Sequence, residues 1–345
     1  MISAQKLEGA GGHKKSGEQY LAVAHTTSPY ITVYPWTSSG FGTKFANPAV
    51  SPGNTGFGVD FNRNNTAIAV TSASYAVIAY AWSSSGFGTK FADPSVGVSV
   101  PYRVTFSKLG NYLAVPSYYN PYVGVYPWSA SGFGAKYADP TVNPGGTTYG
   151  IAFSPNEDVL AVSGISSPYI IAYRWSASGY GTKYSDPSTL PPNYGMGVNF
   201  SPSGDALALA HYGAPFISVY PWSYASGFGT KYSNPATLPT GNANSVEFSP
   251  AGDVVAVSHA TNPIITAYRW SSSGFGTKYS DPATLPGGEG NDLSFSSDGT
   301  ALAVSHSLGS YISVYPWSYA SGFGAKYSNP ATLPTGNGYR VAFSK

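Results

Sequence analysis

The residues of this chain whose types could support chemistry are a few carboxylates outside its repeated turns. They are Asp60, Glu247, Glu289 and Asp292. A carboxylate near a channel could bind a cation or activate water. However, their positions hold Gly, Ala, Thr, Ser or Asn in other copies of an internal repeat, and Asp60 and Glu247 lie four copies apart. We therefore interpret them as structural and predict no catalytic residue, no metal site and no cofactor.

Four histidines share one equivalent position of the repeat. They are His25, His211, His259 and His306, and the other copies carry Ser72, Ser117 and Gly164 there. A shared metal would need ligand nitrogens about 2.0 to 2.1 Å away, whereas packed sheets stand roughly 10 Å apart. We therefore predict a local hydrogen bond from each histidine side chain to the backbone.

The elements that position these residues belong to a repeat marked by tryptophan. A segment of about 47 residues recurs seven times, and its Trp stands at Trp36, Trp82, Trp128, Trp175, Trp222, Trp270 and Trp317. Each copy has four short runs rich in Val, Ile, Tyr and Phe, divided by Gly, Pro, Ser, Asn and Asp, which indicates a four-stranded antiparallel meander. One such sheet cannot bury its own faces. The sequence therefore predicts an all-β, seven-bladed β-propeller.

The two ends of the repeat region are complementary parts of one blade. The first copy begins at its second strand, residues 20–23, and residues 338–345 form a first strand with no blade after it. Pairing the C-terminal strand with the N-terminal blade would close the ring and cover open edges. We therefore predict one propeller domain, residues 16–345, and an N-terminal arm, residues 1–15, outside the repeat.

Residues that recur in every copy are predicted to serve the blade itself. The tryptophans are expected to pack between adjacent blades. An Asn or Asp precedes Pro in each copy, at Asn47, Asp93, Asp139, Asp186, Asn234, Asp281 and Asn329. Because the two types interchange, we predict turn hydrogen bonds to backbone amides rather than acid–base chemistry.

Composition excludes several function classes. Charged residues make up 9% of the chain and the net charge is +2, so a nucleic-acid partner is not expected. The absence of cysteine excludes disulfides and thiol chemistry. No run approaches the roughly 18 to 20 apolar residues that span a bilayer, and residues 1–17 lack the apolar region of a secretion signal. We expect no membrane span.

Variation among the copies is concentrated at one end of the blades. The loops there carry aromatic residues and scattered arginines, whereas the loops at the other end are nearly uniform. The candidate ligand-binding residues are Phe57, Tyr102, Arg103, Tyr118, Tyr119, Tyr149, Tyr194, Tyr212, Tyr339 and Arg340. Aromatic rings with polar tips suit sugar rings or protein loops better than phosphates. We predict a binding surface, and the alternative is that these tyrosines only plug the channel mouth.

The blade pattern resembles that of WD40-like propellers in tailed-phage structural proteins. The resemblance covers residues 16–345 and is carried by Phe-Ser-Pro-Ser-Gly-Asp-Ala-Leu-Ala-Leu-Ala-His at residues 200–211, followed by Pro-Phe-Ile-Ser-Val-Tyr at 215–220. Each Trp is followed by Ser or Thr instead of Asp, so the buried Asp–His network of WD40 repeats is not expected. The resemblance implies a virion component, in a tail, fibre or appendage, that holds a partner or contacts the host.

Three function classes remain. The first is a non-catalytic virion structural or adhesion module that presents its aromatic face to a host-surface glycan or a virion protein. The second is an intracellular protein-interaction scaffold, which would be cytoplasmic. The third is a propeller enzyme, such as a lactonase or glycan lyase, for which we recognise no nucleophile and base, phosphate loop or convergent ligand cluster. We predict the first class and no enzymatic activity.

Overall fold

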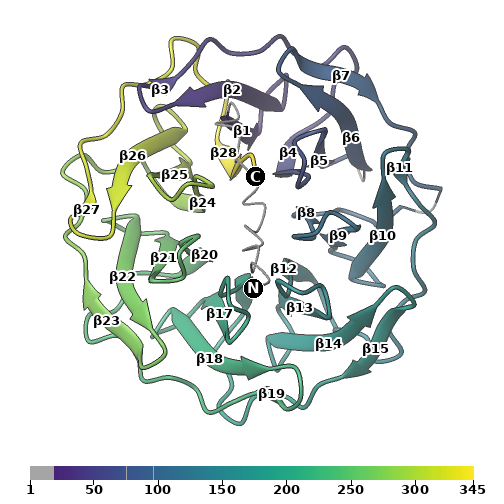
Figure 1. The fold of residues 1–345 in the computed structure, drawn as a ribbon, viewed down its shortest axis with the longest axis vertical. Coiled ribbons are helices and arrows are strands. Elements are labelled where there is room, and N and C mark those ends of the chain that lie inside the picture. The colour runs from purple at the N-terminus through teal and green to yellow at the C-terminus, as the bar shows by residue number, and fades with distance from the viewer. Residues whose placement is uncertain (1–18, 75, 96) are drawn as a thin grey trace, which may run out of the picture.

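Seven four-stranded antiparallel sheets lie in a ring around a central axis (Figure 1). The computed structural model describes residues 19–74, 76–95 and 97–345. Over these ranges the predicted all-β, seven-bladed propeller is confirmed. The described residues contain no helix, and thus no apolar helix of membrane-crossing length.

Each blade orders its strands A, B, C and D from the axis outwards. Blade 1 contains β28 (Gly338–Phe343), β1 (Gln19–His25), β2 (Ile31–Thr37) and β3 (Gly40–Phe41). Blade 2 contains β4 (Gly56–Phe61), β5 (Ala67–Ser72), β6 (Ala76–Ser83) and β7 (Gly86–Lys90). Blade 3 contains β8 (Thr105–Phe106), β9 (Tyr112–Pro116), β10 (Val123–Ser129) and β11 (Gly132–Phe133). Blade 4 contains β12 (Thr148–Phe153), β13 (Val159–Gly164), β14 (Ile170–Ser176) and β15 (Gly179–Lys183).

The remaining blades follow the same order. Blade 5 contains β16 (Gly195–Phe200), β17 (Ala206–His211), β18 (Ile217–Ser223) and β19 (Gly227–Phe228). Blade 6 contains β20 (Ala243–Phe248), β21 (Val254–His259), β22 (Ile265–Ser271) and β23 (Gly274–Lys278). Blade 7 contains β24 (Gly290–Phe295), β25 (Ala301–His306), β26 (Ile312–Ser318) and β27 (Gly322–Phe323). The B strands are apolar on both faces because a neighbouring blade covers each face, and β17 is buried at every residue.

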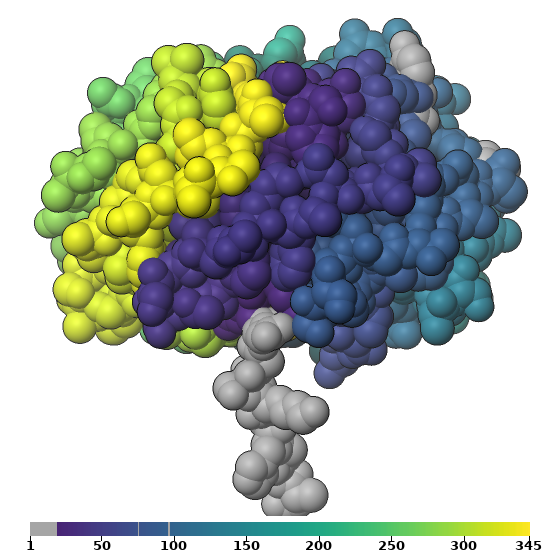
Figure 2. All heavy atoms as spheres, turned by 90° about the horizontal axis from the view of Figure 1, so that it is seen from above, coloured from purple at the N-terminus to yellow at the C-terminus, as the bar shows by residue number. Residues whose placement is uncertain are grey.

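The ring closes where the last strand meets the first. β28 pairs antiparallel with β1, in a register that sets Leu21 opposite Phe343 and Val23 opposite Val341. Figure 2 shows the first and last parts of the described chain side by side at this seam. The Phe343 ring also contacts Trp36, with centroids 5.4 Å apart. The predicted closure is confirmed, whereas the predicted arm, residues 1–15, lies outside the described residues.

The tryptophans pack between blades, as predicted. Trp82 of blade 2 makes edge contacts with Tyr20 and Phe45 of blade 1, with ring centroids 5.3 and 5.1 Å away. It also contacts Phe61 of its own blade at 5.5 Å. One indole therefore joins two apolar sheets, and such contacts add to the free energy of burial.

The Asn or Asp before proline has a partner that the sequence analysis missed. In each copy its side chain accepts a hydrogen bond from a lysine Nζ three residues earlier, as Asn234 does from Lys231 at 2.5 Å. The prediction of a backbone amide partner is wrong, because the donor is instead the side chain of the lysine that precedes the turn. Either Asn or Asp can accept this bond, which explains their interchange.

Candidate functional site

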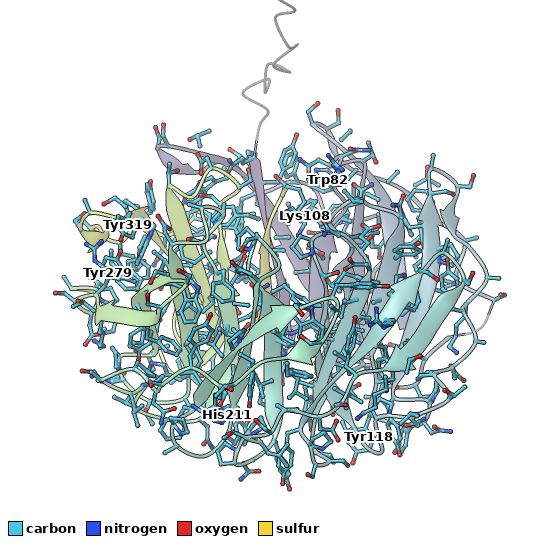
Figure 3. All side chains as sticks on the ribbon, turned by 60° about the horizontal axis from the view of Figure 1, so that its bottom comes forward. Trp82, Lys108, Tyr118, His211, Tyr279 and Tyr319 are labelled. Carbon is cyan, nitrogen blue, oxygen red and sulfur yellow. The ribbon has the colours of Figure 1, made fainter. Side chains whose placement is uncertain are left out.

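The variable loops lie together at one end of the ring. Figure 3 places Tyr118, which follows a B strand, and His211, which ends one, at the end opposite Lys108, which lies in an A-to-B turn. The aromatic side chains predicted to bind ligand come from the A-strand entrances and the B-to-C loops at that end.

Six of these aromatic residues form a continuous surface, which we call the aromatic patch. Its members are Tyr339, Phe57, Tyr102, Tyr149, Tyr118 and Tyr119. Phe57 lies between Tyr339 and Tyr102, with ring centroids 5.2 and 5.5 Å away. The Tyr102 ring also contacts the rings of Tyr149 and Tyr118, with centroids 4.8 and 6.3 Å away, respectively. The patch thus covers part of the A-strand ring and extends outward along one loop of blade 3.

Two predicted tyrosines form a smaller group beside the patch. Tyr194 lies 6.4 Å from Tyr212 and 6.3 Å from Tyr169, which was not predicted. The Tyr212 hydroxyl donates to Asn244 Oδ1 at 3.5 Å. Tyr212 and Tyr194 also raise the pKa of Tyr149, after the larger effect of burial. The two groups are therefore electrostatically coupled.

The two predicted arginines meet at the centre of the ring. Arg103 of blade 3 reaches across the axis and donates from Nη2 to Ser245 Oγ of blade 6 at 3.1 Å and to Asp292 Oδ1 of blade 7 at 3.2 Å. Arg340 of blade 1 donates from Nη1 to the carbonyl oxygens of Asn291 and Tyr339, both at 2.9 Å. We call Arg103, Arg340 and Asp292 the central ion cluster.

Close packing of the A strands makes this reach possible. A Cβ atom on Gly58 would lie 2.8 Å from the Cα of Arg103, and one on Gly197 would lie 2.8 Å from the Cα of Ser245. Glycine therefore permits adjacent A strands to approach more closely than another residue would. The resulting ring centre is narrow enough for one arginine to span.

The electrostatics of the site favour neutral tyrosines and a net positive cluster. Burial, followed by the proximity of Arg103, lowers the pKa of Arg340, and Asp292 opposes this effect. Burial and the neighbouring tyrosines raise the pKa of Tyr102 to about 12. Tyr102 therefore remains a hydrogen-bond donor near neutral pH. The Nε atoms of Arg103 and Arg340 are buried without a hydrogen-bond partner among the described residues.

A second layer of polar side chains joins the blades further along the axis. Asp60, Asn199 and Ser294 occupy the equivalent position of their A strands. Each accepts a hydrogen bond from a backbone N–H in the next blade: Phe106 at 2.8 Å, Phe248 at 3.1 Å and Phe343 at 3.2 Å, respectively. These bonds satisfy the A-strand edge, which has no strand partner on its axial side. The structural interpretation of Asp60 fits this role.

Glu247 and Lys345 complete this layer. Lys345 Nζ lies 2.9 Å from Asp60 Oδ1. Burial lowers the pKa of Lys345, but Asp60 and Glu247 outweigh burial and the net shift is upward. Burial raises the pKa of Glu247 to about 8, because the opposing effect of Lys345 is smaller. Glu247 is therefore largely protonated at neutral pH.

The Asp60 bonds predict a difference between two substitutions. Asp60→Ala should lower the free energy of unfolding by about 2 to 4 kcal/mol, because the amides of Phe61 and Phe106 and the Lys345 ammonium lose their acceptor. Asp60→Asn should cost less than half as much, because Asn199 makes the equivalent inter-blade bond in blade 5. Urea unfolding measures both changes, and equal losses for the two variants would show that the acceptor is not what matters.

The four histidines make the same hydrogen bond across the sheet. Their Nε2 atoms lie 2.9 to 3.0 Å from the hydroxyls of Thr32, Ser218, Thr266 and Ser313 on the adjacent C strands. Backbone partners also occur, since Nδ1 of His211 and of His306 contacts a carbonyl oxygen at 3.1 and 2.8 Å. The predicted local bond is confirmed for these two, but the hydroxyl partner was missed.

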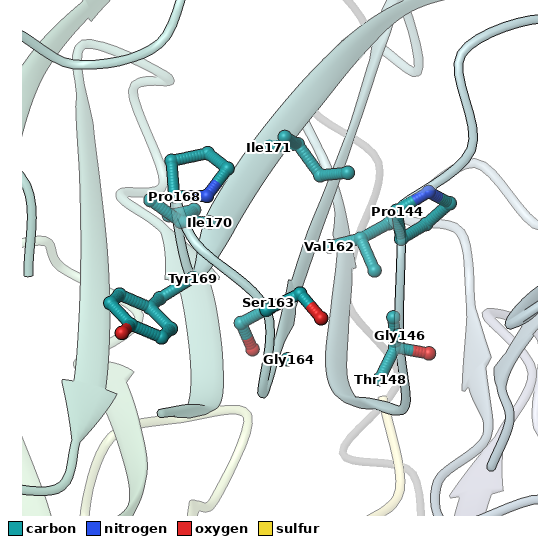
Figure 4. Close-up of a pocket in the computed structure, with 11 residues that line it drawn as sticks. Pro144, Gly146, Thr148, Val162, Ser163, Gly164, Pro168, Tyr169, Ile170 and Ile171 are labelled. Carbon is teal, nitrogen blue, oxygen red and sulfur yellow. The ribbon is translucent and has the colours of Figure 1, made fainter. Parts of the chain in front are cut away.

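A small cavity in blade 4 is not a ligand site. It lies between the loop at Pro144–Thr148 and strands β13 and β14 (Figure 4). Its volume is about 10 Å³, which suits a single water molecule. Ser163 Oγ, which lines it, has no hydrogen-bond partner among the described residues.

This chain is similar to known proteins in structure, although not in sequence. No protein family and no curated protein sequence matches this chain. A Bacteroides fragilis protein provisionally named 6-phosphogluconolactonase is 12% identical, with a TM-score of 0.77 over 96% of this chain and 99% of its own. Pseudomonas aeruginosa periplasmic gluconolactonase is 16% identical, with a TM-score of 0.71 over 95% and 99%. The Swd1 β-propeller domain of Myceliophteria thermophila is 14% identical, with a TM-score of 0.57 over 81% and 88%.

These neighbours confirm the propeller and contradict the predicted function. At such identities the likeness shows the fold alone. Two of the neighbours nevertheless have the names of gluconolactonases, and none of the three is named as a phage protein. The predictions of a non-catalytic virion or adhesion module, and of no enzymatic activity, are therefore corrected. The sequence analysis also did not predict that charged side chains converge at the ring centre.

Proposed function

We propose that this chain is a propeller hydrolase that opens the ester bond of a sugar lactone beside the aromatic patch. The Arg103–Asp292 ion pair carries this proposal, because it brings a carboxylate and a guanidinium together at the ring centre. Arg340 lies close to both and beside Tyr339 of the patch. The names of the two gluconolactonase neighbours support the reaction class.

The inner part of the aromatic patch, at Tyr102 and Tyr149, would bind the sugar ring. Tyr102 and Tyr149 present ring faces for the apolar side of a sugar and hydroxyls for its polar groups. Across the ring centre, Asn244 and Asn291 donate their amide protons to the carbonyls of Gly290 and Gly338, at 2.9 and 2.8 Å. Their positions are thereby fixed, and the surface has an aromatic side and an amide side.

The central ion cluster would perform the chemistry. The positive guanidinium groups of Arg103 and Arg340 would stabilise the lactone carbonyl oxygen as negative charge develops on it. Water attacks the carbonyl carbon while Asp292 accepts its proton. The tetrahedral intermediate collapses with cleavage of the ring C–O ester bond, and Asp292 returns the proton to the departing alkoxide. The product is the open-chain sugar acid.

Hydrolysis of glucono-δ-lactone and of its 6-phosphate tests this function. Acid release is followed in a pH-stat, and the spontaneous rate is subtracted. Asp292→Asn should lower kcat by a factor of about 10² to 10⁴, because asparagine can still accept the Val341 N–H bond but cannot accept a proton. Glu289→Gln, at an exposed carboxylate three residues earlier, should retain activity. The proposal would be refuted if the protein accelerated the hydrolysis of neither lactone, or if the Asp292→Asn variant were as active as the parent.

A further inference from the structure

The aromatic patch is longer than one sugar ring needs. Beyond Tyr102 it continues through Tyr118 to Tyr119, whose ring centroids are 4.7 Å apart. Exposure rises in the same direction, since 42% of Tyr118 and 54% of Tyr119 is accessible to solvent. The outer part of the patch is thus an exposed extension of the candidate site along the surface of blade 3.

The fold does not require aromatic residues at these two positions. The corresponding loop of blade 1 carries Thr26 and Thr27, and that of blade 6 carries Ala260 and Thr261. In all three blades the loop closes with the same backbone hydrogen bond, from Tyr122 N to Tyr119 O in blade 3. Small residues therefore suffice to build it. Exposed aromatic side chains that serve no fold requirement point to a ligand.

The backbone holds the two rings in place. Thr147 Oγ1 donates to the carbonyl oxygen of Tyr118, and Ser117 Oγ donates to that of Tyr119, both at 3.1 Å. The loop is therefore anchored from below while its side chains face outward. Such preorganised aromatic rings offer contact area at a low cost in conformational entropy.

The length of the run of rings and their lack of charge indicate the class of ligand. Successive centroids from Phe57 through Tyr102 and Tyr118 to Tyr119 are 5.5, 6.3 and 4.7 Å apart, so the rings form one run that a ligand longer than a single sugar ring can contact. No lysine or arginine belongs to the outer part, so an anionic group would gain little there. We infer that Tyr118 and Tyr119 form a second sugar subsite and that the substrate is a disaccharide aldonolactone. This assignment rests on the proposed lactonase function for the position of the lactone ring.

Binding of the hydrolysis products tests the subsite separately from catalysis. Titration calorimetry with gluconate and with maltobionate, in which a second glucose is attached to gluconate, should give an affinity about tenfold higher for maltobionate. Tyr118→Ala/Tyr119→Ala should remove that preference, because the affinity for maltobionate should fall to that for gluconate. Tyr224→Ala should change neither affinity, since this similarly exposed tyrosine, 49% accessible, lies in a C-to-D loop at the opposite end.

The outcomes separate the two proposals. Equal affinities for the two acids, no measurable maltobionate binding, or a preference that survives in the double variant would overturn the second subsite. A maltobionate preference lost in the double variant supports it, even if neither lactone is hydrolysed, and that failure would count against the lactonase function alone. Hydrolysis of glucono-δ-lactone without a preference for maltobionate would support the lactonase function and overturn the second subsite.

Discussion

Deletion of residues 338–345 should abolish cooperative folding of the propeller. The deletion removes β28, which supplies the A strand of blade 1 and buries Val341, Ala342 and Phe343. Loss of a buried phenylalanine alone costs about 3 to 5 kcal/mol, and a typical domain is stable by only about 5 to 15 kcal/mol. The deletion also exposes one edge of β1 and removes the aromatic contact with Trp36.

Urea unfolding followed by tryptophan fluorescence and gel filtration measures this effect. The shortened chain should show a broad transition and an expanded volume. Deletion of residues 1–15, outside the repeat, is the control and should leave the unfolding midpoint unchanged. Phe343→Ala keeps the strand and should lower the free energy of unfolding by about 3 to 5 kcal/mol. A sharp transition in the chain without β28 would mean that the seam is not needed for closure.

Stability should be greatest near pH 6.5 and should fall on both sides. Burial lowers the pKa of His25, His259 and His306 from 6.5 to about 4, and that of His211 is also lowered. Between pH 4 and 6.5 the unfolded chain therefore binds more protons than the folded chain, so stability is lost as the pH falls. Each of the three histidines contributes up to about 3 kcal/mol by this effect.

Glu247 has the opposite dependence. Its folded pKa is raised from 4.5 to about 8, so between these values the folded chain binds more protons than the unfolded chain. Stability contributed by the protonated carboxyl is therefore lost as the pH rises to 8. Below pH 6.5 the combined effect of the four histidines exceeds that of Glu247, so stability falls as the pH falls. Between pH 6.5 and 8 Glu247 alone among these five groups changes its protonation in the folded chain, so stability falls as the pH rises.

Urea midpoints at pH 4.5, 5.5, 6.5 and 8 measure both slopes. Glu247→Gln should flatten the curve between pH 6.5 and 8 and leave the acid side intact. His306→Gln should weaken the acid slope by about a quarter, because one of four buried histidines is replaced and glutamine can still bond to Ser313. A midpoint that does not change between pH 6.5 and 4.5 would mean that the histidines take up protons in the folded chain as readily as in the unfolded chain.

Much of the fold could be read from the sequence because its determinants are local and repeated. Each blade carries its own strand pattern, its own turns and one tryptophan, so seven copies specify seven sheets. The seam between residues 20–23 and β28 was also predictable, since each part lacks what the other supplies. The alternation of strand direction also predicted that Tyr102, Tyr118 and Tyr149 lie at the same end of the ring.

The convergence of the candidate site was decided only by the tertiary structure. Arg103 is separated from Ser245 by 142 positions and from Asp292 by 189, and no local pattern links them. Considered one blade at a time, Asp292 looked like an isolated variation of a repeat position, so its contact with Arg103 was not predicted. Ring closure and the close approach permitted by Gly58 and Gly197 bring these charges together. The sequence by itself determined the blades and which loops share one end of the ring, because those depend on neighbours along the chain. Which side chains meet at the axis depends on the width of the closed ring, which is a property of all seven blades together.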